Sequence, residues 1–280
     1  MGKFKTVLLM VGLVFIFMYL GELVGGEQGM IIAFLFACGI NFFSYFFSDK
    51  IVLKQYNAKE VNVISEPVLY RVVKRLAMKA GLPMPKVYVI PDNIPNAFAT
   101  GRNPANAAVA ATRGLLNAMN EEELEGVMAH EMTHVKNYDI LTGTIVAALA
   151  GAVIILARTA GYGRGGRQAR GAGGAALFAL IFMPIAAFMI KFSISRTREY
   201  AADEGSANLT KHPEWLISAL RRLEMYSARG IIQNASPQTA HMFIVSPFGS
   251  LKSNFSSLFS THPSTKDRIK ALEKIRENLR

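Results

Sequence analysis

The sequence has a single cysteine, Cys38, which lies inside an apolar run. A lone cysteine can form no intramolecular disulfide. Acidic residues are also few, since 20 Asp and Glu stand against 31 Lys and Arg and leave a net charge of +11. Such an excess is typical of nucleic-acid-binding proteins and of membrane proteins whose orientation it fixes. Because 51% of the residues are hydrophobic and the mean hydropathy is +0.25, we favour a membrane protein and expect no nucleic-acid partner.

The N-terminal part contains two apolar stretches, residues 7–24 and 30–47, separated by the short sequence GELVGGEQG. Each is close to the ~20 residues that a helix needs to cross the hydrocarbon core. Both outer ends carry lysines whereas the turn carries only glutamates, which predicts that both ends lie in the cytoplasm. No small-residue cleavage site follows the first stretch, so a signal peptide is disfavoured. Residues 1–48 are therefore predicted to be a transmembrane hairpin.

Two further apolar stretches, residues 140–157 and 171–190, are joined by a glycine-rich linker with four arginines. If both stretches cross the membrane, these arginines lie on the outer side, against the usual distribution of positive charge. We therefore expect residues 140–194 to form a second apolar hairpin that either spans the membrane or lies shallow in it. In both cases the flanking segments share one compartment, so residues 49–139 and 195–280 are predicted to build one water-facing, cytoplasmic part.

The sequence HEMTH lies in a predicted helix, with Asn120 as its N-cap and Glu123 placed to complete a capping box. His130 and His134 are one turn apart on this helix, so both imidazoles can bind the same Zn²⁺. Glu131 can reach the open side of that metal. The alternative is a pair of exposed histidines on an amphipathic helix. The helix also carries charged residues that would be costly inside a membrane, which favours a site in water.

A catalytic zinc usually has three protein ligands and one position left for water, so a third ligand is expected. Glu199 suits this role best, because Asp203 follows it by four residues on a predicted helix after the fourth apolar stretch. Asp203 could accept a hydrogen bond from the ring of a ligand histidine. The alternative for Glu199 is a surface ion pair with the neighbouring arginines. His212 and His241 lack acids at helical spacing and are expected at the surface.

Short strands of one small sheet are predicted for KVYVI (86–90), NAFAT (96–100) and AAVAAT (107–112). An exposed edge strand can bind an extended peptide through main-chain hydrogen bonds. The residues that would do so lie in the second of these strands and are Asn96, Ala97, Phe98 and Ala99. An ordinary core hairpin explains the same pattern equally well.

Together these motifs resemble those of the HtpX-type membrane zinc metalloproteases, a family related to the CaaX prenyl proteases. The resemblance covers nearly the whole chain and rests on the apolar hairpins and four motifs in order: NAFATG (96–101), HEMTHVKNYD (130–139), REYAAD (198–203) and THPSTKDRIKAL (261–272). It implies a mainly α-helical, integral membrane, zincin-like (gluzincin) metalloprotease with a small β-sheet and two apolar helical hairpins.

The resemblance also implies a role for each residue of the site. One Zn²⁺ per subunit would be held by His130, His134 and Glu199, with Glu131 as general base and Asp203 behind the ligands. It favours substrate binding by the strand at residues 96–99.

By the same resemblance, His262 and Arg268 would contact the substrate or the oxyanion. The motif here reads HPST where a second proline is usual, so a structural turn is the alternative for His262.

The expected function is a zinc-dependent endopeptidase in the bacterial cytoplasmic (inner) membrane, multi-pass, with its active site facing the cytoplasm. Its substrates would be polypeptides, above all misfolded or damaged membrane proteins, in a stress response. The alternative is a non-catalytic membrane scaffold or chaperone-like binder with a structural zinc. Two amphipathic helices, PEWLISALRRLEMYS and STKDRIKALEKIREN, are expected to pack over the site, while residues 228–260 between them give no clear pattern.

Overall fold

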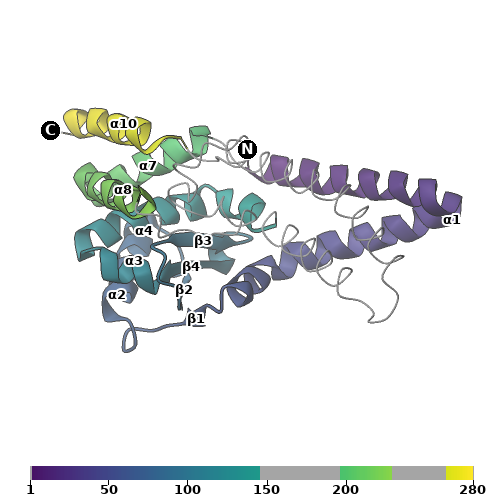
Figure 1. Ribbon diagram of the computed structural model, residues 1–280, viewed down its shortest axis with the longest axis horizontal. Helices are drawn as coiled ribbons and strands as arrows, with labels where there is room; N and C mark the ends of the chain where they lie inside the picture. Colours follow the sequence, from purple (N-terminus) through teal and green to yellow (C-terminus); the bar gives the residue numbers. More distant parts are fainter. Residues whose placement is uncertain (1, 146–195, 229–262, 280) are drawn as a thin grey trace.

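The computed structural model describes residues 2–145, 196–228 and 263–279. Figure 1 shows a long helical hairpin that projects from a body in which helices surround a small sheet. The prediction of a mainly helical protein with a small β-sheet is confirmed. Most of the second apolar hairpin, and the segment at 229–262, lie outside the described residues.

The projecting hairpin is α1 (Gly2–Gln55), which reverses at Gly26, the one residue inside it with non-helical dihedral angles (φ 60°, ψ −149°). The sequence predicted a turn of several residues here. Glycine adopts positive φ readily, so one residue suffices to turn the chain. The two arms, Thr6–Leu23 and Gly25–Gln55, are both long and apolar enough to cross a membrane.

The sheet has four strands, and all three predicted strands are confirmed. The strands are β1 (Lys59–Glu60), β2 (Lys86–Ile90), β3 (Ala97–Gly101) and β4 (Ala107–Thr112), in the order β1-β2-β4-β3. β4 is parallel to β2 and antiparallel to β3. Every residue of β4 is buried, whereas β3 forms one edge of the sheet.

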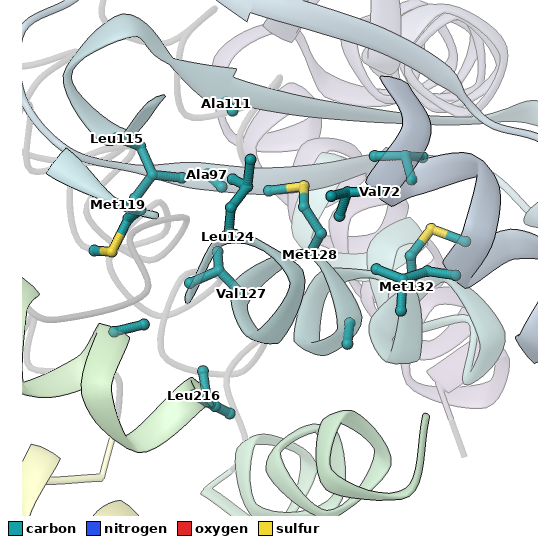
Figure 2. Close-up of a cluster of buried hydrophobic side chains, with 14 of the residues drawn as sticks. Val72, Ala97, Ala111, Leu115, Met119, Leu124, Val127, Met128, Met132 and Leu216 are labelled. Atoms are coloured by element: carbon teal, nitrogen blue, oxygen red, sulfur yellow. The ribbon is translucent and has the colours of Figure 1, made fainter. Parts of the chain in front are cut away.

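Helix α4 (Glu121–Lys136) crosses the middle of the body and carries HEMTH. The predicted capping box is present: the Asn120 side chain accepts from the Glu123 amide (2.8 Å), and the Glu123 carboxylate accepts from the Asn120 amide (3.1 Å). Figure 2 shows Leu124 and Met128 on the side of Ala97 and Ala111, with Leu216 across the helix. Helices α2 (Pro67–Ala80) and α3 (Arg113–Ala118) and the 3-10 helix η1 (Pro104–Asn106) complete this half.

Three further helices cover the other side of α4: α7 (Arg196–Thr210), α8 (Pro213–Ala228) and α10 (Thr265–Asn278). The two predicted C-terminal amphipathic helices, α8 and α10, are confirmed. Glycine lets α8 approach α4 closely, because a Cβ at Gly126 would lie 2.7 Å from the backbone nitrogen of Leu216. The carbonyl of Gly126 also accepts a hydrogen bond of 2.8 Å from Ser206 Oγ of α7.

We predict that Gly126→Ala lowers stability, although alanine favours a helix over glycine by about 1 kcal/mol. The added methyl group would push against the backbone of α8, and overpacking of this kind costs about 1–3 kcal/mol. Thermal unfolding in detergent should show a lower Tm than for Gly39→Ala, a glycine of α1 with nothing within 4 Å of the added Cβ. A Tm equal to that of the Gly39 variant would contradict the close contact.

Candidate metal centre

Three predicted ligands converge on one point between α4 and α7. His130 Nε2 and His134 Nε2 are 3.2 Å apart, as their spacing of one helical turn predicts. Glu199 Oε2 lies 3.6 Å from the first nitrogen, and Glu199 Oε1 lies 3.5 Å from the second. The cluster is mostly buried, with Glu199 only 7% exposed. The alternatives of exposed histidines and of a surface glutamate are therefore excluded.

A carboxylate faces the far nitrogen of each imidazole. His130 Nδ1 lies 3.0 Å from Asp203 Oδ1, and His134 Nδ1 lies 3.2 Å from Asp139 Oδ2. An ionised carboxylate can only accept, so each neutral ring carries its proton on Nδ1 and keeps a lone pair on Nε2. Two lone pairs and a carboxylate oxygen then point at one another. Such a group of acceptors is stable only with a cation between them.

The spacing of the two Nε2 atoms fits a metal ion of the size of zinc. Ligands about 2.0–2.1 Å from a tetrahedral Zn²⁺ are separated by about 3.3 Å, close to the 3.2 Å between these nitrogens. The nitrogens lie 3.6 and 3.5 Å from different oxygens of the Glu199 carboxylate, which is near enough to provide a third ligand. Two histidines and a glutamate are also a ligand set of catalytic zinc sites. Within the described ranges, no fourth His, Cys, Asp or Glu joins the cluster. Three ligands from these residues would leave one position of a tetrahedral ion for water or substrate.

Asp203 is held from two sides. Arg268 of α10 donates to both of its oxygens, from Nε at 2.9 Å and from Nη2 at 2.6 Å, while His130 contacts the same carboxylate. Burial on its own would raise the pKa of Asp203, but the charge and hydrogen bonds of Arg268 bring it below the usual range. Asp203 therefore stays ionised and can fix the ring of His130.

The pKa of His130 depends on the same contacts. Burial favours the neutral ring, but the hydrogen bonds with Asp203 and Glu199 outweigh it and raise the pKa to about 9. Without a metal, a proton would therefore occupy the Nε2 position. Because a metal and a proton compete for this lone pair, the cluster binds one cation or the other.

Arg268 lies behind His130, with Nη2 3.4 Å from the ring Nδ1, and its side chain is 1% exposed. Its hydrogen bonds with Asp203 connect it to the metal cluster. A contact with substrate or the oxyanion stays a prediction. His262 and His241 lie outside the described residues. His212 is exposed, as predicted, and stacks on Trp215.

Asp139, the partner of His134, was not predicted from the sequence. Helix α4 ends at Lys136, and Tyr138 then takes a positive φ of 60°, which turns the chain back so that Asp139 lies beside the last turn. Arg198, one residue before Glu199, pairs with the other oxygen of Asp139 at 3.4 Å. The sequence does contain an acid shortly after the second histidine. It can reach that histidine only because the chain turns at Tyr138, and no glycine at this position predicts such a turn.

Glu131 lies between the ligand histidines and the edge strand β3. Its Oε2 accepts a hydrogen bond of 2.9 Å from the backbone amide of Ala99. Burial raises the pKa of Glu131, while the two nearby histidines and the Ala99 amide act in the opposite direction. The carboxylate is thus oriented by the strand and has an increased affinity for protons, both of which suit a general base.

The predicted substrate strand lies at the edge of the sheet next to α4. Backbone groups alternate in direction along a strand. The amides of Ala99 and Gly101 donate to side chains outside the sheet, so the backbone groups of Ala97, Ala99 and Gly101 face away from β4. Two of these amides have partners, since Ala99 donates to Glu131 and Gly101 donates to Thr144 Oγ1 at 3.2 Å. Asn96, before the strand, is buried and donates its amide to Thr112 Oγ1.

Comparisons with known proteins agree with this site. The model of peptidase family M48 matches residues 64–276. A Protease HtpX homolog of Campylobacter hominis is 58% identical over 282 residues, which cover 100% of both chains. A Protease HtpX homolog of Campylobacter curvus is 59% identical over 98% of both chains, and one of Thermococcus sibiricus is 48% identical over 98% of this chain and 96% of that one.

A solved structure, that of S. mikatae Ste24p, has a similar fold with a TM-score of 0.53 and 19% identity. The match covers 96% of this chain and 64% of that chain. Family model and full-length relatives agree with the motifs and with the cluster of two histidines and a glutamate. The chain therefore belongs to peptidase family M48 and is one of its HtpX-type members.

Proposed function

We propose that this protease is a zinc-dependent endopeptidase of the gluzincin type, with one Zn²⁺ held by His130, His134 and Glu199. The observation that carries the proposal is the convergence of their three ligand atoms, with both Nδ1 protons held by carboxylates. A zinc ion at this point would supply a Lewis acid, which polarises a peptide carbonyl and lowers the pKa of bound water to about 7.

The residues of the chain then have separate tasks. Glu131, next to the ligands, takes a proton from the attacking water and delivers it to the leaving amine. Asp203 and Asp139 fix the ring orientation of His130 and His134, so that both Nε2 lone pairs stay directed at one point. Arg268 compensates the buried charge of Asp203. Because its side chain is buried, we assign it a positioning role.

An extended polypeptide would pair with the outer edge of β3. Because the Ala99 amide donates to Glu131, the outward carbonyls of Ala97 and Ala99 would accept hydrogen bonds from the substrate backbone. Main-chain pairing of this kind reads no particular sequence, which suits a protease with many substrates. The substrate's scissile bond would lie between β3 and the histidines. Asn96 and Phe98 point their backbone groups towards the sheet, so they would support the strand without contacting the peptide backbone.

The apolar hairpin α1 supports a membrane anchor. Both arms are long and apolar enough to span a membrane. Many of their large apolar side chains are exposed, among them Phe15, Leu23, Ile32 and Leu35. Lysines at both outer ends favour a cytoplasmic active site in a bacterial inner membrane. We propose membrane proteins, misfolded or damaged ones in particular, as the substrates, because the hairpin holds the site close to the bilayer.

Glu131→Gln should retain zinc and fold but lose activity by at least about a hundredfold, because the amide cannot accept a proton. Cleavage of an unfolded model protein in detergent measures this, with Glu122→Gln, an exposed neighbour on α4, as the matched control. Equal rates for the Glu131 variant and the wild type would remove Glu131 from the mechanism. Normal zinc content without cleavage in the wild type would favour a scaffold with a structural zinc.

Glu199→Ala should lower the zinc content of the purified protein well below one per chain, because only two protein ligands would remain. Elemental analysis by mass spectrometry measures the content. Glu204→Ala, on the exposed side of the same helix, should keep the wild-type value. Stoichiometric zinc in the Glu199 variant would mean that this residue is not a ligand.

Asp139→Asn should weaken zinc binding by about 10–100-fold, the usual effect of losing the partner of a ligand histidine. Competition with a chromophoric chelator measures the affinity, and circular dichroism checks that the helices are unchanged. The same affinity as in the wild type would show that the contact with His134 has no role in holding the ring.

A further inference from the structure

A cavity of about 560 Å³ lies between the hairpin α1 and the catalytic body, apart from the metal centre. Val7 and Met10 of the first arm and Tyr45 of the second arm line one side of it. Arg102, which directly follows β3, and Leu141, after α4, line the other. Its volume falls in the range of about 300–1,000 Å³ that is typical of small-molecule sites.

The position of the cavity along the hairpin is marked by an aromatic cluster. Phe42, Phe43, Phe46 and Phe47 surround Tyr45 in the sequence and are all partly or fully exposed. Two cations lie over these rings: the Arg102 guanidinium is 5.3 Å from the Phe46 centroid, and Lys50 Nζ is 5.5 Å from that of Phe47. Tyrosines are enriched at the level of lipid headgroups, and Lys and Arg side chains near helix ends reach the same level. Tyr45, Lys50 and Arg102 therefore place the opening of the cavity where headgroups would lie.

The described residues that line the cavity carry one charge, which is positive. Among them, Arg102 is the only charged residue. Its polar contacts are to neutral acceptors, from Nη2 to Asn106 Oδ1 at 3.1 Å and from Nη1 to the carbonyl of Phe46 at 3.5 Å. In the part of the chain that the structure describes, Arg102 forms no ion pair. A guanidinium binds phosphate in a bidentate manner, so an anion with a phosphate group suits this place.

We propose that the cavity binds one anionic phospholipid, with its phosphate on Arg102 and the start of an acyl chain against Val7, Met10 and Leu141. The apolar side of the cavity continues into the first arm of α1, which gives the chain a path into the bilayer. None of the described lining residues is a carboxylate that could pair with an ammonium headgroup, so phosphatidylglycerol binds in preference to zwitterionic lipids. This inference rests on the proposed membrane anchor but not on the proposed catalysis.

The experiment titrates the full-length protein in detergent with dioleoyl phosphatidylglycerol or dioleoyl phosphatidylcholine and counts bound lipids by native mass spectrometry. Arg102→Gln should weaken phosphatidylglycerol binding about tenfold, the effect of losing a hydrogen bond to a charged group. Phosphatidylcholine carries the same phosphate, so the wild type should bind it more weakly than phosphatidylglycerol and the Arg102 variant should bind it more weakly still. Lys50→Gln removes an equal charge at the same level but outside the cavity, and should change binding less than twofold. Met10→Trp should reduce lipid binding by filling the apolar side while Arg102 stays in place.

Equal losses for the Arg102 and Lys50 variants would overturn the proposal, because a general surface charge would explain them. Displacement of the lipid by soluble glycerol phosphate would assign the cavity to a free phosphate compound, and displacement by an unfolded polypeptide would assign it to substrate. An alkaline carbonate wash of the cell membranes tests the anchor separately. Protein that stays in the membrane but shows no preference for phosphatidylglycerol contradicts the lipid site alone.

Discussion

The arrangement on which the site depends is the pair of imidazoles whose Nδ1 atoms each face a carboxylate. Because Asp203 and Asp139 can only accept, the rings of His130 and His134 must turn lone pairs towards each other. Lone pairs that face each other repel unless a cation lies between them. Two arginines of the surrounding fold hold the carboxylates, and through them the rings, in place. Arg268 compensates the charge of Asp203, and Arg198 does the same for Asp139.

The fold can be understood as a means of bringing three distant segments to α4. The sheet edge brings Ala99 to Glu131, α7 brings Glu199 and Asp203, and α10 brings Arg268. Close approach of these helices needs small residues, of which Gly126 and Gly205 are examples, since a Cβ at either would clash with its neighbour. The stability of the body and the geometry of the site therefore depend on the same contacts.

Features with a local signal could be predicted from the sequence. The capping box and the four-residue spacing of the histidines follow from the repeat of one helix, and Glu199 was found because Asp203 follows it one turn later. Asp139 and the place of Arg268 could not be predicted in this way. The first depends on a positive φ at Tyr138, and the second on how α10 packs against α7, which no local pattern encodes. The edge position of β3 also required the strand order.

The most direct test of the account is X-ray absorption at the zinc edge on protein purified without added metal. The account predicts about one zinc per chain, with two imidazole nitrogens at about 2.0–2.1 Å and oxygen atoms as the remaining ligands. A spectrum with four protein nitrogen or sulfur ligands, or a fully active protein without metal, would contradict a cation-dependent site with one open position.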